Sequence, residues 1–394
     1  MKEWKTYRLE ELGDIVGGAT PSTKEPLNYD GDIAWLTPKD LSTFNERFIS
    51  NGERSITKRG YDSCSCKMLP KGSVLFSSRA PIGYVAIAQN DLCTNQGFKS
   101  FIPSSKVDSL FMYYLLKYKK DDIASLGCGT TFMEVSGSVM KNVEVNIPDI
   151  ATQHRIADIL SSIDNKIELN NRINHNLEEQ AQALYKSWFV DFEPFKDGKF
   201  VESELGQIPE GWRVGQLSEI AKITMGQSPS GTSFNEDGNG IVFYQGRTEF
   251  GFRFPSIRLF TTEPTRYAEP DSVLLSVRAP VGDVNIASQR CCIGRGLASI
   301  ESISGNSSFI LYTILSLHST LDRYNGEGTV FGSVNRKELE SLSVIIPPEN
   351  IQNRFEQIAS TLDEEIKSKS KELNQLLESR DSLLPRLMSG EIIC

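Results

Sequence analysis

Two glycine-rich turns are the stretches of this chain that come nearest to a chemical motif. They lie at residues 127–132 (GCGTTF) and 326–331 (GEGTVF). Such turns cradle a phosphate or a cofactor when they join a strand to a helix. Here each turn follows an expected helix, and no acidic residue stands just ahead in the right place. We therefore expect both turns to close their domains.

No catalytic or metal-binding constellation is predicted. His154, His175 and His318 stand singly on expected helices, without partnered Cys or carboxylate ligands. The Pro-Pro pair at 347–348 lacks the Asn/Asp-Pro-Pro-aromatic pattern of methyltransferases that act on exocyclic amines. The seven cysteines have neither metal-ligand nor disulfide spacing, so reduced thiols are expected. The chain is expected to be non-catalytic and to hold no metal or cofactor.

Composition predicts a cytoplasmic protein of two or three domains without a membrane segment. Its 394 residues are 39% hydrophobic, with no apolar run of the ~20 residues that span a bilayer and no signal peptide. The net charge is −9, and residues 1–150 carry 18 basic and 18 acidic side chains. Duplex DNA is bound first through its phosphates, so a DNA role requires a local basic cleft or charge from another subunit. Ten of the twelve cations in 201–347 are arginines, which suit guanine edges and phosphates.

The chain contains an internal duplication. Residues 4–36 are similar in sequence to the residues 208 positions later, and residues 73–83 to those 199 positions later. Between about 41 and 72 the first copy has nine extra residues and no recognisable counterpart in the second copy. Each copy is expected to contain alternating strands, then a helix, then a final strand. In the first copy these lie at 84–88, 106–119 and 143–147, and in the second copy at 283–287, 307–321 and 342–346. A twofold repeat suggests a ligand or partner that is itself double, either DNA with two half-sites or a symmetric protein dimer.

Each copy is followed by a long helix with an apolar seam. The seam begins at Ile156 and returns 199 positions later from Phe355. Each helix would run for about 55 Å and needs a partner to cover its seam. An antiparallel coiled coil is the simplest pairing, with Asn170, Asn174, Lys369 and Arg380 as polar residues that fix its register. The alternative is that each helix packs on its own globular neighbour.

Residues 183–195 (ALYKSWFVDFEPF), residues 383–392 (LLPRLMSGEI) and the order of the repeat resemble the specificity subunit of type I restriction–modification enzymes. The resemblance implies an α+β fold: two pseudo-symmetric target-recognition domains joined by two long helices that form an antiparallel coiled coil. The expected parts are a recognition domain at 1–150, a helix at 151–191, a second recognition domain at 200–347 and a helix at 348–394.

The same resemblance implies a role in phage defence. Each recognition domain would read one half of a bipartite, asymmetric double-stranded DNA site, and helix length would set the gap. Two methyltransferase subunits and the restriction subunits would bind the chain and carry the S-adenosylmethionine, ATP and Mg²⁺ chemistry. The alternatives are a stand-alone DNA methyltransferase and a coiled-coil scaffold that reads no bases.

The candidate base readers are polar residues that occupy equivalent positions in the two copies but differ in type from one copy to the other. Donor-bearing side chains of this kind recognise purine edges in the major groove. The candidates are Thr37, Lys39, Asn95, Gln96, Gln245, Arg247 and Arg295. The alternative for any one of them is a solvated loop side chain.

Arg79 and Arg278 are identical in the two copies, so either they clamp phosphates or they hold the adjoining turn. The basic residues of the unmatched insert either follow the DNA backbone or serve surface solubility; they are Arg47, Arg54, Lys58 and Arg59, of which Lys58 and Arg59 are taken as candidate contacts. Thr130 and Thr329 of the glycine-rich turns are further candidates for contact with the backbone.

The resemblance implies that hydrophobic residues near the helix ends bind the partner subunits. These residues are Leu184, Trp188, Phe189, Phe192, Leu384 and Leu387. The alternative for the aromatic cluster at 188–195 is that it caps the helix pair and plugs the second domain, and this alternative is preferred for Trp188.

Overall fold

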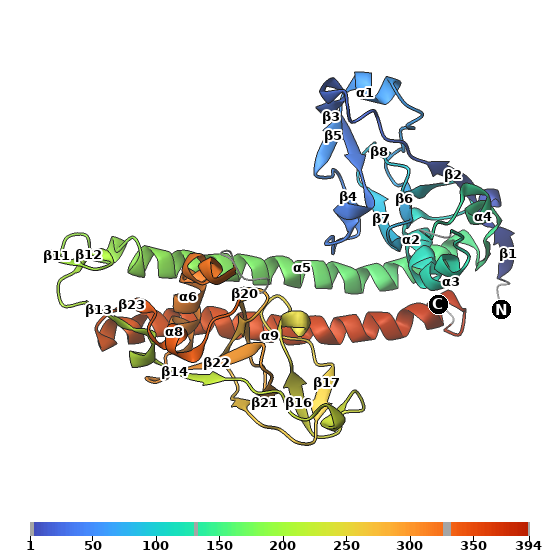
Figure 1. Ribbon diagram of the computed structural model, residues 1–394. Helices are drawn as coiled ribbons and strands as arrows, with labels where there is room; N and C mark the ends of the chain where they lie inside the picture. The colour runs from blue at the N-terminus through green and yellow to red at the C-terminus, as the bar shows by residue number, and fades with distance from the viewer. Residues whose placement is uncertain (1–3, 130–132, 326–331, 393–394) are drawn as a thin grey trace. The chain divides into compact units, whose positions relative to one another are not determined.

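Two long helices run through a chain that divides into two units. The computed structural model describes residues 4–129, 133–325 and 332–392 (Figure 1). Unit 1 comprises residues 1–171 and 372–394, and unit 2 comprises residues 172–371. Helices α5 (Ile150–Phe189) and α9 (Glu349–Met388) contribute residues to both units. Each unit therefore combines one mixed α+β segment with a part of each helix.

Unit 1 contains a five-stranded sheet of order β2-β9-β6-β7-β4, a three-stranded sheet of order β5-β3-β8, and the pair β1-β10. Its strands are β1 (Lys5–Arg8), β2 (Gly13–Gly17), β3 (Tyr29–Leu36), β4 (Phe48–Ile49), β5 (Arg54–Ile56), β6 (Val74–Ser78), β7 (Ile82–Ala88), β8 (Cys93–Thr94), β9 (Lys99–Pro103) and β10 (Glu144–Ile147). Its short helices are α1 (Lys58–Asp62), α2 (Ser109–Tyr118), α3 (Lys120–Ser125) and α4 (Gly137–Asn142).

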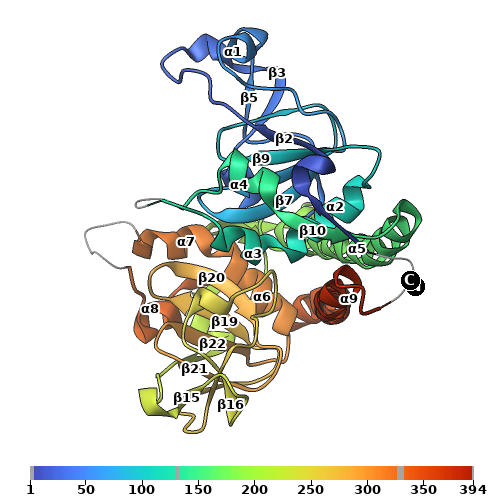
Figure 2. The same ribbon diagram turned by 90° about the vertical axis from the view of Figure 1, so that its right-hand side faces the viewer.

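Burial and capping explain the central layer of unit 1. Every residue of β6 is buried, as expected for a strand covered on both faces. Helix α2 begins where the Asp108 carboxylate accepts a hydrogen bond from the Phe111 amide, 2.8 Å away. Helices α2 and α3 pack against β7 (Figure 2). Phe76 and Phe111 lie in the core that results.

Unit 2 contains a four-stranded sheet of order β14-β22-β19-β20, a five-stranded sheet of order β15-β17-β16-β21-β18, and the pairs β11-β12 and β13-β23. Its strands are β11 (Phe200–Ser203), β12 (Gly206–Pro209), β13 (Arg213–Gln216), β14 (Ala221–Met225), β15 (Phe234–Asn235), β16 (Ile241–Tyr244), β17 (Leu259–Thr261), β18 (Tyr267–Ala268), β19 (Val273–Val277), β20 (Val281–Ile286), β21 (Cys291–Ile293), β22 (Leu297–Ser302) and β23 (Ser343–Ile346). Its short helices are α6 (Ser307–Ser316), α7 (His318–Asp322) and α8 (Arg336–Glu340).

The predicted duplication is confirmed at the level of sheet topology. The order β2-β9-β6-β7 in unit 1 matches β14-β22-β19-β20 in unit 2. The predicted helix at 307–321 is divided at Leu317 into α6 and α7. The predicted helix at 106–119 starts later, at Ser109, because Asp108 is its N-cap.

The insert between residues 41 and 72 does have a structural counterpart, contrary to the sequence-based expectation. Strand β5 lies antiparallel to β3 in unit 1, and β17 lies antiparallel to β16 in unit 2. Likewise, the isolated bridge between Leu69 and Leu92 corresponds to the pairing of Ala268 with Cys291. The match is in backbone pairing rather than side-chain identity, so the sequences alone do not reveal it.

The two long helices pack antiparallel within each unit. In unit 1, Ile156 and Leu160 of α5 share a core with Leu387 of α9. In unit 2, Ala181 and Trp188 of α5 share a core with Phe355 of α9. The pairing of low-numbered positions of one helix with high-numbered positions of the other confirms the predicted direction. No helix of the described residues has a stretch apolar and long enough to span a bilayer.

Polar residues interrupt the seam where the sequence predicts, and two of them, Asn170 and Asn174, are buried. The predicted Lys369 forms an ion pair with Glu365 of its own helix at 3.4 Å. In unit 1, Asn170 donates from Nδ2 to Oε2 of Glu372 at 3.0 Å, and Arg380 donates to Asp164 at 3.3 Å. In unit 2, Asn174 donates to the Ser370 hydroxyl at 3.3 Å. Because directional bonds cannot be kept after a shift along the seam, these pairs favour one register in each unit.

Candidate nucleic-acid interface

In unit 1, two predicted reader loops lie side by side because they follow parallel strands. Strands β3 and β8 are parallel, with Leu36 paired to Thr94 at their carboxyl ends. The Asn95 amide donates to the Leu36 carbonyl at 2.8 Å. A side chain at Gly97 would collide with Pro38, so only glycine permits this approach. Residues 37–40 and 95–97 therefore share one edge of the unit.

Unit 2 repeats this arrangement with different side chains. Strands β16 and β21 are parallel, with Tyr244 paired to Ile293. The Gly294 amide donates to the Tyr244 carbonyl at 2.8 Å, and the Gly296 amide donates to the Gln245 carbonyl at 3.2 Å. The loops that contain Gln245, Arg247 and Arg295 are thereby placed together.

The identical arginines adjoin these loops. In unit 1, the Ser78 amide donates to the Gly97 carbonyl at 2.7 Å, which places Arg79 next to the second loop. In unit 2, the Val277 amide donates to the Gly296 carbonyl at 2.9 Å and places Arg278 in the same way. We call each assembly of two loops and one arginine a rim. Rim 1 consists of residues 37–40, 95–97 and Arg79, and rim 2 of residues 245–248, 294–296 and Arg278.

Two predicted readers of rim 1 use their polar atoms to shape the loops. The amide and hydroxyl of Thr37 donate to the Asp40 carboxylate at 2.6 and 2.8 Å, as in a helix cap. The Asn95 side-chain oxygen accepts from the Gly97 amide at 2.8 Å. These contacts assign Thr37 and Asn95 a structural role that the sequence pattern did not predict. Base readout by either residue stays a prediction.

The other two predicted readers of rim 1 are exposed. Lys39 forms an ion pair with Glu53, 2.7 Å from Nζ to Oε2, and the hydrogen bond to Glu53 raises the pKa of the ammonium. Gln96 accepts a hydrogen bond from the Thr20 hydroxyl. Exposed pairs of this kind are weak and can exchange partners when a ligand approaches.

The two loops of rim 2 contain two exposed arginines, and the side chain of one of them is unpaired within the described residues. Arg247 pairs with Asp283, whereas the side chain of Arg295 has no hydrogen bond or ion pair with the described part of the chain. Gln245 is also exposed. Arginine binds guanine or phosphate through a planar fork of donors, so these side chains have suitable chemistry for a DNA groove.

The remaining predicted backbone contacts lie outside the rims. Lys58 and Arg59 are exposed on α1, where Lys58 pairs with Asp62 at 2.8 Å and Arg59 pairs with Glu25 at 3.4 Å. Arg54 stacks its guanidinium over the Tyr29 ring. Thr130 and Thr329 lie outside the described residues, so their predicted contacts are not tested.

Arg47 is buried, although the sequence predicts a cation that follows the DNA backbone or serves surface solubility. It is 5% exposed and cannot follow a DNA backbone. Its Nε donates to Glu168 Oε1 at 2.9 Å, and its NH2 donates to Glu168 Oε2 at 3.0 Å and to Asn165. Burial alone would lower the pKa of the guanidinium, but Glu168 and Tyr114 reverse that effect and raise it. Arg47 therefore fastens the β-rich part of unit 1 to α5.

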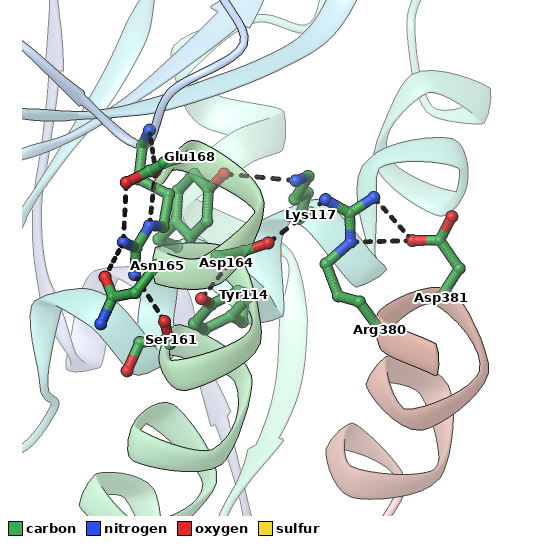
Figure 3. A network of polar contacts seen from close by, with 10 residues as sticks. Tyr114, Lys117, Ser161, Asp164, Asn165, Glu168, Arg380 and Asp381 are labelled. Atoms are coloured by element: carbon green, nitrogen blue, oxygen red, sulfur yellow. Dashed lines mark hydrogen bonds and ion pairs between the residues drawn. The ribbon is translucent and has the colours of Figure 1, made fainter. Parts of the chain in front are cut away.

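Neighbouring polar groups extend this contact to α9. Asp164 accepts from the Tyr114 hydroxyl at 2.7 Å and from Arg380 at 3.3 Å (Figure 3). Lys117 lies close by, and burial together with the Arg380 charge lowers the pKa of its ammonium. The network joins α2, α5 and α9 within unit 1.

Arg253 makes the equivalent contact in unit 2. Its carbonyl accepts from the Ile286 amide, as the Arg47 carbonyl accepts from Ile87. The side chain is 6% exposed and donates to Asp363 at 3.0 Å and to Glu178. Arg47 thus connects a β-rich segment to α5, and Arg253 connects one to both α5 and α9.

The predicted partner-binding residues mostly lie in the cores of the units. Trp188 and Phe189 are buried with Phe355, and Leu387 is buried with Ile156. Leu184, Phe192 and Leu384 are partly buried against the same cores. A buried side chain cannot provide a docking surface, so the prediction is wrong for Trp188, Phe189 and Leu387. The alternative expectation, that Trp188 caps the helix pair, agrees with its position.

The described residues contain no group of three or more His, Cys, Asp or Glu side chains able to hold a metal ion. His154 lies 3.8 Å from Asp108, and the exposed His175 lies 3.3 Å from Glu179. The cysteines within the described part of the chain are free thiols.

The fold and the rims define a duplicated α+β recognition protein with one candidate binding edge in each unit. The family model of the type I restriction modification DNA specificity domain matches residues 1–179 and 209–378. The chain therefore belongs to the type I restriction–modification DNA specificity family.

Individual relatives are similar over nearly the whole chain. The type I restriction enzyme MjaIX specificity subunit of Methanocaldococcus jannaschii is 35% identical, over 99% of this chain and 94% of the relative. The HindI specificity subunit of Haemophilus influenzae is 26% identical over the full length of both. The crystal structure of an S subunit from M. genitalium has a TM-score of 0.65 at 18% identity, covering 98% of this chain and 96% of that one, which supports the fold.

Proposed function

We propose that this chain is the DNA sequence-specificity subunit of a type I restriction–modification complex. Rim 1 would read one half of a bipartite site, and rim 2 the other half. The observation that carries the proposal is that the rims share one backbone frame but present different polar side chains. A shared frame supports the same mode of docking on DNA, and different donors support different sequences.

The long helices have a separate part in this proposal. Each has 40 residues, equivalent to about 60 Å of helix, and each contributes to both units. We propose that their length sets the number of base pairs between the half-sites. Adding one turn to both helices would lengthen that gap and leave both half-sites unchanged.

Catalysis is assigned to other subunits. We propose that two methyltransferase subunits bind this chain and supply S-adenosylmethionine-dependent adenine methylation, while restriction subunits supply ATP- and Mg²⁺-dependent cleavage. The nearly neutral composition of residues 1–150 supports this division, since a chain without a basic domain needs partners for strong DNA binding. The same partner subunits would then supply both the positive charge for DNA binding and the catalytic activity.

Mapping methylated adenines in the genome of a host that carries the complete system tests the proposal. We expect a single two-part motif, which is lost when the gene for this chain is deleted. Unchanged methylation after deletion would contradict the proposal. Stoichiometric binding of S-adenosylmethionine by the isolated chain would favour a stand-alone methyltransferase instead.

A further inference from the structure

In each unit, the rim arginine is paired through the backbone with a residue outside the candidate sites predicted from the sequence. The Val135 amide donates to the Ser78 carbonyl at 3.0 Å, and the Val334 amide donates to the Val277 carbonyl at 3.1 Å. Isolated β-bridges pair Arg79 with Glu134 in unit 1 and Arg278 with Ser333 in unit 2. Glu134 and Ser333 therefore occupy equivalent positions, 199 residues apart.

The side chains at this position differ in chemistry. In unit 1, Glu134 Oε1 lies 3.1 Å from Nζ of Lys99, and Oε2 lies 3.5 Å from NH1 of Arg79. Lys99 also lies 3.4 Å from the Ser78 hydroxyl. The positions equivalent to Glu134 and Lys99 in unit 2 hold Ser333 and Ala298, and neither can form such a cluster.

The formal charge at the equivalent positions is nevertheless the same. Arg79, Lys99 and Glu134 sum to one positive charge, as does Arg278 with two uncharged neighbours. A lone carboxylate beside DNA would be repelled by the phosphates. Lys99 offsets that repulsion, so unit 1 gains a fixed hydrogen-bond acceptor without losing net positive charge.

The acceptor is both held in place and accessible. The Lys99 side chain is 15% exposed, whereas that of Glu134 is 36% exposed. Two cations fix the carboxylate, which lowers the conformational entropy lost when it binds a ligand. The strand end at Ser78 joins this cluster to the 95–97 loop of rim 1.

We propose that Glu134 is a base-reading residue of unit 1, and that its carboxylate accepts a hydrogen bond from the exocyclic amine of cytosine. Carboxylates accept from cytosine N4 in the major groove. Lys99 and Arg79 position the carboxylate and neutralise its charge. This inference rests on the proposed function, because it assigns one residue to the half-site read by unit 1.

The test uses the assembled complex with its methyltransferase subunits and a DNA library randomised in one half-site at a time. Glu134→Gln keeps the size of the side chain but replaces one acceptor oxygen by a donor. At one base pair of the unit 1 half-site, we expect the preference for cytosine to fall about 5- to 150-fold and the preference for adenine to rise. The unit 2 half-site should not change.

The matched variant pair exchanges the cluster between the units. Lys99→Ala with Glu134→Ser gives unit 1 the side chains of unit 2, and Ala298→Lys with Ser333→Glu does the reverse. Each pair should alter one base position in its own half-site only, and thermal unfolding of each complex reports its folding. Because Ala298 is buried, the exchange in unit 2 is the less conservative of the two.

A uniform loss of affinity for all sequences with Glu134→Gln would overturn the inference, because it would show that the cluster only supports the fold or the DNA backbone. Unchanged base preference would overturn it too. In both cases a wild-type complex that still selects a two-part site leaves the proposed function intact. A wild-type complex that selects no such site contradicts the proposed function itself.

Discussion

The guanidinium of Arg47 lies 2.9 Å from the carboxylate of Glu168, although the two residues are 121 positions apart. Both side chains are almost excluded from solvent. A buried pair of this kind is costly to break because one charge is left without a partner. In unit 1, the contact fastens strand β4 and the segment before it to helix α5.

Arg47→Met should therefore destabilise unit 1 by about 3–5 kcal/mol, measured by urea unfolding of the purified chain. Arg59→Ala is the matched control: Arg59 forms an exposed pair with Glu25, and its loss should cost at most about 1 kcal/mol. Arg47→Met combined with Glu168→Met should recover part of the loss. Equal effects of the Arg47 and Arg59 substitutions would contradict the assignment of Arg47 as a structural anchor.

Arg278 is expected to contact a phosphate rather than a base. Arg278 is exposed and forms no ion pair with the part of the chain that the structure describes, and its counterpart Arg79 is the same residue type. In the assembled complex, Arg278→Ala should weaken binding to all sequences alike and reduce the slope of log affinity against log salt by about 1. Arg336→Ala, which removes an arginine paired with Glu340 at 2.7 Å, serves as the control. An unaltered salt slope for Arg278→Ala would refute the phosphate contact.

Arg295 is expected to read a base. Arg295→Gln should cost about 1–3 kcal/mol of discrimination at one base pair of the half-site read by unit 2, with the other half-site unaffected. Competition binding with single-base variants of the site measures this cost. Equal weakening on every variant would instead assign Arg295 to the DNA backbone.

Glu356 should make the stability of unit 2 depend on pH. Its carboxylate accepts from the Ser308 and Phe309 amides at 3.1 and 3.0 Å, at the start of α6. Burial raises the pKa of Glu356, and those two amides compensate only in part. Because the pKa of Glu356 is higher in the folded state than in the unfolded state, protonation of Glu356 stabilises the folded state. This contribution to the free energy of unfolding is fully present at a pH below the unfolded-state pKa, and it is lost as the pH rises through the folded-state pKa.

The stability difference between wild type and Glu356→Gln should accordingly shift in favour of wild type as pH falls from 7 to 5. Urea unfolding of both proteins in the same series of buffers measures this difference. A shift in favour of Glu356→Gln on acidification would show that the sign is wrong.

The sequence predicted features that recur with a fixed spacing. The heptad seam predicted the pairing of Ile156 with the far end of α9, and the 199-residue offset predicted matching sheets. The predicted reader loops also proved to be neighbours, since the strands that precede them are parallel. In each case a periodic or repeated pattern carries the information.

Single contacts between distant residues were not predictable in this way. Arg47 resembles a surface cation in the sequence, and only the fold places it beside Glu168. In the sequence, Trp188 and Phe189 resemble a docking surface, but in the fold both side chains are buried against Phe355. The Glu134 cluster could have been found, because the offset aligns Glu134 with Ser333 and Lys99 with Ala298, yet nothing local to those residues marks them.

Exchange of residues 200–347 for those of another family member tests the central claim most directly. The chimaera is expressed with the partner subunits, and the methylated adenines of the host genome are mapped. We expect one half of the motif to change, while the other half and the gap stay the same. A motif unchanged in both halves, or changed in both, would contradict the assignment of one half-site to each unit.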